Sequence, residues 1–539
     1  MTVLWRLSLT DKSLINDRNL IVIELIMSPN TLKNNKRIAR NTLALYFRTF
    51  ITMLVGLYTG RVMLQALGIE NYGINNVVGC IVGFSGILTG SMGQGVSRFM
   101  TFSLGKDTLE RQKVVFSTCV NAQIIIAIIV CLMLEVVGVW FLNYEANIPE
   151  RRMVAANWVL QCSIFSLGIG LINSPFSGLI VAHEHMGIYA YMSIADVILR
   201  LSMCFAILYY GGDRLILLSL LGVLEGIGMT LFYNWYSRRC FQEARYHFKS
   251  FDKALYKEMI SFSGWNLFGN SAWIFSTQGV NMLINVFFGV AFNAARGIAV
   301  TVNGAVQSFV GNFTVSFTPQ ITKSYAAGDI DYAVGLATRG TKFTWLLMYV
   351  FIVPVCCEAD ILLKLWLGTP PEWSAVFLRF AMFESLAVQF GQTLLNLIRA
   401  DGRVKKYNLM VTAFAALVFP LTWFLYHLGA PVWSTYVIFI VVYGFLNIIR
   451  FITLRRLMDF STRRFLNDCL WPCIIVSFTS FIIPLVLCYC MKPGVIRFLI
   501  NVPIAVLWTT LCCTYLGLTK HEREFFIAKV KDVLVKIRR

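Results

Sequence analysis

Long apolar runs, separated by short stretches rich in glycine, proline and charge, dominate the chain. At about 20 residues or more, each run is long enough for a helix to cross a bilayer. Fourteen such runs predict an all-α integral membrane protein with about 14 transmembrane helices. The predicted helices are 42–66, 74–99, 114–142, 153–182, 186–210, 214–236, 258–288, 292–318, 343–367, 374–398, 407–428, 432–453, 468–490 and 494–517.

The composition supports a chain that lies mostly in lipid. Of its 539 residues, 57% are hydrophobic and 14% are charged, and the mean hydropathy is +0.67. A soluble domain has about 45–50% apolar and about 25% charged residues, so a soluble enzyme with a single membrane anchor is excluded. The 14 cysteines form no C-x-x-C pair and lie mainly in apolar runs. They are expected to pack as small hydrophobes, and no metal site is predicted.

The net charge of +19 is explained by topology. Most of the 47 lysines and arginines fall in alternate loops and beyond the first and last helices, and few, such as Arg151 and Arg214, fall in the loops between. Because positively charged loops resist translocation, this asymmetry places both termini in the cytoplasm. No nucleic-acid partner is needed to account for the charge.

An internal repeat divides the chain into two halves. The segment LGIENYGI after the first helix is echoed by FGVAFNAARGI after the seventh. Transporters are often built from repeats whose interface holds the substrate. We therefore predict two six-helix pseudo-repeat lobes plus two C-terminal helices. The predicted parts are a cytoplasmic segment 1–41, an N-lobe 42–236 with helices 1–6, a basic cytoplasmic linker 237–257, a C-lobe 258–456 with helices 7–12, helices 13–14 within 468–517, and a basic cytoplasmic tail 518–539.

The first 26 residues do not look like a signal peptide, because acidic residues lie within them and their apolar run is short and late. Met27 leads directly into the polar, basic stretch NNKRIARN, which suits the cytoplasmic flank of a first helix. We expect the native protein to begin at Met27.

Three segments resemble the bacterial polysaccharide flippases of the O-antigen and capsule type. These segments are NNKRIARNTLALYFR (34–48), LGIENYGINNVVGCIVGF (67–84) and NAARGIAVTVNGAVQSFVGNFTVSFTPQITKSYAAGD (293–329). The flippases share a superfamily with multidrug and toxin extruders and lipid II flippases, and the resemblance extends over essentially the whole chain from Met27. It implies movement of undecaprenyl-pyrophosphate-linked oligosaccharide across the bacterial inner membrane for lipopolysaccharide or other surface polysaccharide. The implied partners are that lipid-linked oligosaccharide, membrane lipids and the polysaccharide polymerase machinery.

Ionisable residues inside a span are costly and therefore mark candidate functional sites. Asp196 and Arg200 lie four residues apart in the fifth predicted span, so their side chains share a helical face. They form either a packing ion pair or a site where the Arg200 guanidinium binds pyrophosphate in a bidentate manner. Arg48 and Arg61 lie on nearly opposite sides of the first span. Each either reaches the membrane interface or binds substrate.

Three further residues are candidates on the same grounds. Arg296 begins the eighth span, and the resemblance implies that it faces the lumen of a lobe. Glu225 and Glu384 are interpreted as lone carboxylates in the sixth and tenth spans. Each is either a protonated, hydrogen-bonded group or, with Asp196, a candidate for coupling transport to a Na⁺ or H⁺ gradient. No cofactor is predicted.

The seventh and eighth spans are rich in side-chain amides. Asn281 and Asn285 share one helical face, and Asn303 and Gln307 share another. Interhelical hydrogen bonds would explain some of these amides. We favour a hydrated wall that accepts sugar hydroxyls, and we assign these four residues to substrate binding.

Taken together, the sequence predicts a transporter that flips lipid-linked oligosaccharide by alternating access between two lobes, and not an enzyme. The alternative is an ion-coupled multidrug or metabolite antiporter of the same fold, which would favour an acidic cavity. A membrane glycosyltransferase or polymerase would require a sizeable outer loop or an acidic catalytic motif, and the predicted loops leave no room for one.

Overall fold

The computed structural model describes an all-helical chain, with no β-strand among the described residues. Ten of the described helices are long and apolar enough to span a membrane. The segments that miss this criterion include the amide-rich region predicted as spans seven and eight. The described residues are 29–86, 96, 99–104, 107–183, 185–247, 250–402, 404–458, 460–524 and 527–528, and the predicted start at Met27 lies outside them.

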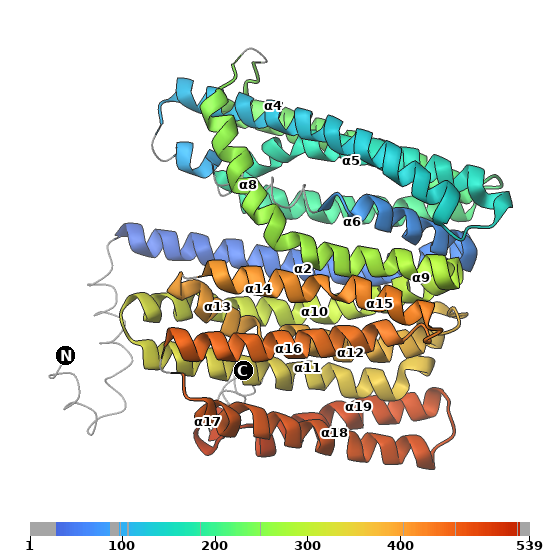
Figure 1. Ribbon diagram of the computed structural model, residues 1–539, viewed down its shortest axis with the longest axis vertical. Helices are drawn as coiled ribbons and strands as arrows, with labels where there is room; N and C mark the ends of the chain where they lie inside the picture. Colours follow the sequence, from blue (N-terminus) through green and yellow to red (C-terminus); the bar gives the residue numbers. More distant parts are fainter. Residues whose placement is uncertain are drawn as a thin grey trace, which may run out of the picture.

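The helices form two lobes and an appended pair, as predicted (Figure 1). The first lobe contains α2 (Pro29–Gly83), α4 (Leu109–Met133), α5 (Met153–Ala182), α6 (Met186–Leu208) and α7 (Arg214–Cys240). The second contains α8 (Lys253–Ile274), α9 (Val280–Phe288), α10 (Val290–Ala326), α11 (Ile330–Leu367), α12 (Ser374–Phe390), α13 (Gln392–Asp401), α14 (Val404–Ala416), α15 (Val418–His427) and α16 (Ser434–Leu457). The pair consists of α18 (Trp471–Cys490) and α19 (Val495–Cys512), preceded by the short helix α17 (Thr462–Phe465), and it packs on α11.

Short helical turns of other types extend or connect these helices. π-helical turns continue α4 and α19, join α8 to α9 and join α17 to α18, and 3₁₀ turns precede α5 and follow α7. They are η1 (Leu134–Gly138), η2 (Phe141–Glu145), η3 (Glu150–Arg152), η4 (Gln242–Ala244), η5 (Phe275–Gly279), η6 (Leu466–Leu470) and η7 (Cys513–Gly517).

Large apolar side chains cover the outside of the bundle, as expected in lipid. On α7, Leu224 and Leu231 are 63% and 64% exposed, and on α18 Phe478 is 76% exposed. Water would penalise such exposure by about 25 cal/mol per Å² of apolar surface, whereas lipid does not. The chain is therefore a multi-pass membrane protein.

The linker between the lobes is bound to the first lobe. His247 N–H donates to Ser117 Oγ and Asp252 N–H to Thr118 Oγ1, each at 3.1 Å, and both hydroxyls belong to α4. The Asp252 side chain caps α8 and pairs with Arg111 at 2.7 Å. Its hydrogen bonds with the start of α8 and with Arg111 lower the pKa of Asp252. We call the end of the bundle with this linker the inner end, and the opposite one the outer end.

Candidate functional site between the two lobes

Two glycines turn the chain at equivalent points of the two lobes. Gly68 divides α2 into two helices with φ of 75° and ψ of 170°, and Gly289 divides α9 from α10 with φ of 87° and ψ of −179°. A positive φ is readily adopted by glycine and strained in other residues. The predicted repeat motifs LGIENYGI and FGVAFNAARGI thus begin with the same backbone turn.

Just beyond these turns, the two lobes contact each other through glycines. A Cβ atom on Gly73 would lie 2.1 Å from the carbonyl oxygen of Val290 in the other lobe. A Cβ atom on Gly297 would lie 2.6 Å from the side-chain nitrogen of Asn76. Each repeat therefore offers one glycine against which the other repeat packs. Backbones that approach so closely leave no room for solute at the outer end of this seam.

Toward the inner end, the seam between α2 and α10 holds a cavity of about 270 Å³. It is lined by small, hydroxyl-bearing and apolar residues, namely Thr49, Thr52, Met53, Gly56, Leu57, Thr301, Gly304, Ala305 and Ser308. Between α2 and α10, the interface is thus tight near Gly73 and hollow near Thr52.

In the first lobe, Arg200 on α6 contacts two carboxylates. Its Nε lies 3.3 Å from Asp196 Oδ2, which confirms the contact predicted from their spacing of four. The same Nε lies 3.2 Å from Glu225 Oε1 on α7. The interpretation of Glu225 as a lone carboxylate is therefore wrong, because α6 and α7 pack side by side and bring it to Arg200. The Arg200 side chain is 61% exposed, whereas that of Glu225 is 8% exposed.

In the second lobe, Arg296 on α10 is buried, with 5% of its surface exposed. Its guanidinium lies over the ring of Tyr436, 5.7 Å from the centroid. Its Nε and Nη1 have no hydrogen-bond partner among the described residues. Glu384, partly buried on α12, interacts with Arg296 electrostatically, so it too has a cationic neighbour. A buried guanidinium with unused donors has the capacity to bind an anion.

The predicted amide residues lie in the second lobe and contact protein groups. Ser385 Oγ donates to Asn303 Oδ1 at 2.7 Å, and Gln307 Nε2 donates to the same hydroxyl at 2.5 Å. These two amides therefore join α10 to α12. Asn281 is partly buried on α9, and its backbone carbonyl accepts from Asn293 Nδ2 at 2.9 Å.

Asn285 connects the two lobes near the outer end of the seam. Its Oδ1 accepts a hydrogen bond at 2.9 Å from the backbone N–H of Asn147, in the loop after η2, while its Nδ2 has no partner among the described residues.

Arg61 is partly buried on α2, without an ion pair to another described residue. The Arg48 side chain lies outside what the structure describes. Substrate contact by any of these residues stays a prediction.

Solved structures of low sequence identity share this architecture. Lipid II flippase MurJ in an inward closed conformation is 11% identical with a TM-score of 0.66, covering 87% of this chain and 97% of MurJ. An inward-facing multidrug resistance MATE family transporter of the MOP superfamily is 12% identical with a TM-score of 0.62, covering 75% of this chain and 94% of the transporter. No protein-family model and no curated protein sequence matches the chain.

The chain has the fold of the MOP-superfamily transporters. A third example is the MOP superfamily transporter from Pyrococcus furiosus, described as having a binding pocket of reverse polarity that suggests a different function. It is 12% identical with a TM-score of 0.57, covering 78% of this chain and 95% of its own. Identities this low establish the fold and leave the substrate open.

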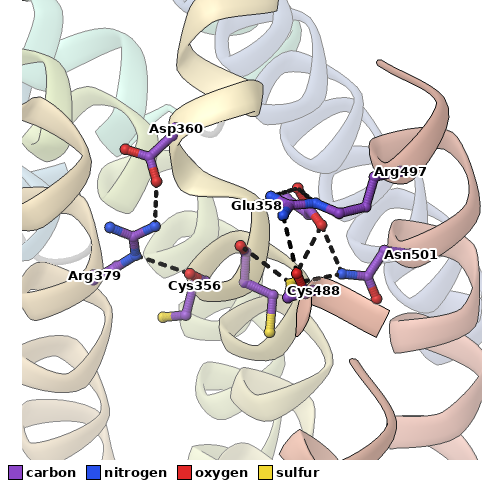
Figure 2. Close-up of polar contacts among 8 residues, drawn as sticks. Cys356, Glu358, Asp360, Arg379, Cys488, Arg497 and Asn501 are labelled. Carbon is purple, nitrogen blue, oxygen red and sulfur yellow. Dashed lines mark hydrogen bonds and ion pairs between the residues drawn. The ribbon is translucent and has the colours of Figure 1, made fainter. Parts of the chain in front are cut away.

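A charged cluster that sequence reasoning missed attaches the C-terminal helix pair to this fold (Figure 2). Glu358 lies where α11 bends, with φ of −116° and ψ of 23°. Its carboxylate accepts from Arg497 Nη2 at 3.0 Å and from Asn501 Nδ2 at 2.7 Å, both on α19, and from Cys488 Sγ on α18 at 3.5 Å. The signal available in the sequence was a single glutamate within the apolar run VPVCCEADILL.

The same bend of α11 receives support from α12. Arg379 Nε donates to the carbonyl oxygen of Cys356 at 2.9 Å, and its Nη2 pairs with Asp360 (Figure 2). Pro354 precedes the bend and has no N–H to donate within the helix. At this bend, α12 thus supplies a donor to the backbone of α11, while α18 and α19 bind the Glu358 side chain.

A second ion pair at the outer end fixes the start of α7. Arg152 pairs with Asp213 through two hydrogen bonds of 2.7 and 3.0 Å, and Asp213 also caps α7 by accepting from Leu215 N–H and Ile216 N–H. The hydrogen bond from Arg152 is the largest cause that lowers the pKa of Asp213 below its usual value. This pair stabilises the first lobe where its helices meet the outer loops.

Proposed function

We propose that the protein flips a lipid-linked oligosaccharide, carried on polyprenyl pyrophosphate, from the cytoplasmic to the periplasmic leaflet of a bacterial inner membrane. The two lobes would alternate between a state that is open inward and one that is open outward. The pyrophosphate and the sugars would pass between the lobes while the polyprenyl chain stays in lipid. The product would supply the synthesis of surface polysaccharide.

Alternating access is supported by the seam between the lobes. The seam is closed by Gly73 and Gly297 at the outer end and contains a cavity at the inner end. A substrate that begins in the cytoplasmic leaflet requires an entry state that opens inward. Among the similar solved structures, one is described as inward-facing and another as outward-facing.

The observation that carries the proposal is the guanidinium of Arg296. A cation inside a membrane protein costs several kcal/mol unless it is paired or hydrated, and two of the nitrogens of Arg296 have no partner among the described residues. A pyrophosphate would supply several acceptor oxygens for these unused donors, and phosphate oxygens are acceptors that arginine binds well.

Arg200 would supply a second cation in the opposite lobe. Because a guanidinium is costly in hydrocarbon, its 61% exposure suits a position that faces water and not lipid. Asp196 and Glu225 already contact it and would compete with a phosphate for the same donors. Such competition would permit release of the substrate. Protonation of a carboxylate would remove its competition and favour binding, and deprotonation would favour release, so transport would depend on the proton gradient.

A second candidate function is cation-coupled antiport of a drug or metabolite. It is favoured by the two carboxylates of Asp196 and Glu225 around the single arginine Arg200, because this surplus gives the first lobe an acidic site when both are ionised. The two functions therefore differ in the group that recognises the substrate. A flippase would use the basic Arg296 of the second lobe, and an antiporter would use the acidic Asp196 and Glu225 of the first.

The test uses the full-length protein in liposomes that contain a fluorescent lipid-pyrophosphate oligosaccharide in one leaflet, with and without a Na⁺ or H⁺ gradient. We expect faster movement to the other leaflet than in empty vesicles. Arg296→Gln and Arg200→Ala should each slow it at least about tenfold, as expected for loss of a charge-assisted contact. Arg463→Ala, at an exposed position on α17, serves as the matched control.

No movement above empty vesicles, together with gradient-driven export of a cationic dye, would refute the flippase and support the antiporter. Full flipping by both arginine variants at wild-type abundance would remove these residues from the substrate path. Circular dichroism and gel filtration of each variant separate a folding defect from a transport defect.

A further inference from the structure

Lys342 is a buried lysine in the inner half of α11, with 1% of its surface exposed. Lysine is almost never fully buried unless it is paired. Its Nζ lies 2.6 Å from Oε2 of Glu522, which follows α19 and is 180 residues away in sequence. The ion pair therefore holds the segment after α19 against the second lobe.

Glu522 is itself fixed by its own segment. The backbone N–H of Thr519 donates to Glu522 Oε2 at 2.9 Å, and the N–H of Glu522 donates to Thr519 Oγ1 at 3.4 Å. This reciprocal arrangement starts a helical turn. Burial raises the pKa of Glu522, but the hydrogen bonds from Lys342 and Thr519 outweigh it and leave the pKa below its usual value. The carboxylate is therefore ionised at neutral pH.

The same glutamate lines a cavity of about 860 Å³ between α10, α11 and α19. Most of the residues that line the cavity are apolar, among them Phe309, Leu347 and Val350. Its inner end is formed by Arg339, His521 and Glu522, because α11 begins and α19 finishes at the inner end of the bundle.

The charges at this inner end suit an anion. Arg339 is exposed, and its Nε donates to the carbonyl oxygen of Gly335 on its own helix at 3.2 Å. Lys342 does not line the cavity and is covered by the Glu522 carboxylate, which does. An apolar slot with a basic inner end has the chemistry of a site for a single hydrocarbon chain with an anionic head. Glu522 occupies the place of the head.

We infer that the segment 518–524 is a latch, in which Glu522 imitates the anionic head of a polyprenyl phosphate lipid and holds its entry site shut. The incoming head takes over Lys342 and Arg339, Glu522 is released, and the polyprenyl chain enters the apolar slot. The inference rests on the proposed function, because it takes its ligand from the substrate class named there. It adds a site outside the seam between the lobes and a control of access to it.

The test measures binding of farnesyl diphosphate, a short polyprenyl pyrophosphate, to the full-length protein in detergent by calorimetry. Inorganic pyrophosphate and farnesol are measured in parallel as the head alone and the chain alone. Glu522→Gln should bind farnesyl diphosphate about tenfold more tightly, since a competing partner of a buried cation is removed. Glu524→Gln, an exposed change of equal charge on the same segment, should bind like wild type. Adding Lys342→Met to Glu522→Gln should abolish the gain.

A second measurement uses wild-type protein, so it does not depend on a variant that folds. Farnesyl diphosphate should raise trypsin cleavage at Lys520 and Arg523, because the latch is released. Equal affinities of Glu522→Gln and wild type, or unchanged cleavage, would overturn the latch. An equal gain for pyrophosphate alone would overturn the role of the apolar slot. These readouts concern binding, so failure of the latch and failure of flipping in liposomes are separate results.

Discussion

Substituting glutamine for Glu358 tests whether the buried charge cluster fixes the C-terminal helix pair to the second lobe. Glu358 has no exposed side-chain surface, and the Arg497 side chain is 10% exposed. The substitution conserves volume and removes the negative charge, so it opens no cavity. What remains is a buried guanidinium whose Nη1 donates to the carbonyl oxygen of Cys488 at 3.3 Å.

The expected cost follows from that geometry. Removing one partner of a buried ion pair costs about 3–5 kcal/mol, because the other charge is left uncompensated. The glutamine oxygen can still accept from Asn501, which now donates at 2.7 Å, so we expect the lower end, about 3 kcal/mol. Adding Arg497→Met should restore most of the loss, since no buried cation is then left.

The assay is a double-mutant cycle on unfolding in mixed detergent micelles, comparing wild type, each single variant and the double variant. We expect a coupling energy of about 4–5 kcal/mol between the two positions, because each single variant leaves one buried charge unpaired and the double variant leaves none. Asp360→Asn is the control, because its pair with Arg379 is largely exposed and is worth less than about 1 kcal/mol. Additivity within about 0.5 kcal/mol would refute the cluster as a stabilising ion pair.

Two further predictions concern the outer end of the bundle. Gly73→Ala places a Cβ atom 2.1 Å from a carbonyl oxygen of α10 and should disfavour the closed seam by about 1–3 kcal/mol. The measurement is amide hydrogen exchange, which should become faster across residues 290–297. Gly79→Ala, which meets no atom within 4 Å, should not change this exchange, and equal exchange in both variants would contradict the idea. Arg152 lowers the pKa of Asp213 in the folded protein. The ion pair therefore contributes its full stabilisation above the unfolded-state pKa of about 3.9, and this contribution is lost as the pH falls through the lower pKa of the folded state. Thermal unfolding of wild type and Asp213→Asn is measured from pH 6 to pH 3. Wild type should unfold at a higher temperature at pH 6, and the two unfolding temperatures should converge below about pH 4. A difference that stays constant with pH would count against this ion pair.

Much of the fold could be predicted from the sequence because lipid imposes a simple length and polarity rule on each span. The predicted run 153–182 coincides with α5, and 374–398 lies within α12 and α13. Glycines were also informative, since the motif that starts at Gly68 is repeated at Gly289 with the same positive φ. These are local features that depend on neighbours in the chain.

The candidate site was predictable only where its contacts are local. Asp196 and Arg200 could be paired because four residues correspond to about one helical turn. Glu225 joins Arg200 across 25 residues, Glu358 joins Arg497 across 139, and Lys342 joins Glu522 across 180. Such pairs depend on which helices pack together, and periodicity along one helix does not reveal that. Because buried charges need partners, the sequence indicates that each of these residues has one, but it does not identify which residue the partner is.

The crossed glycine contacts have a consequence for the origin of the chain. Position 73 of the first repeat contacts the start of the second, and position 297 of the second contacts the first. Each repeat thus packs against the other through a glycine near the same turn, much as the subunits of a twofold homodimer use the same surface toward each other. A single ancestral lobe with this surface could associate with an identical copy before gene duplication joined the two. Later divergence would then have been free to make one half basic at Arg296 and the other acidic around Arg200.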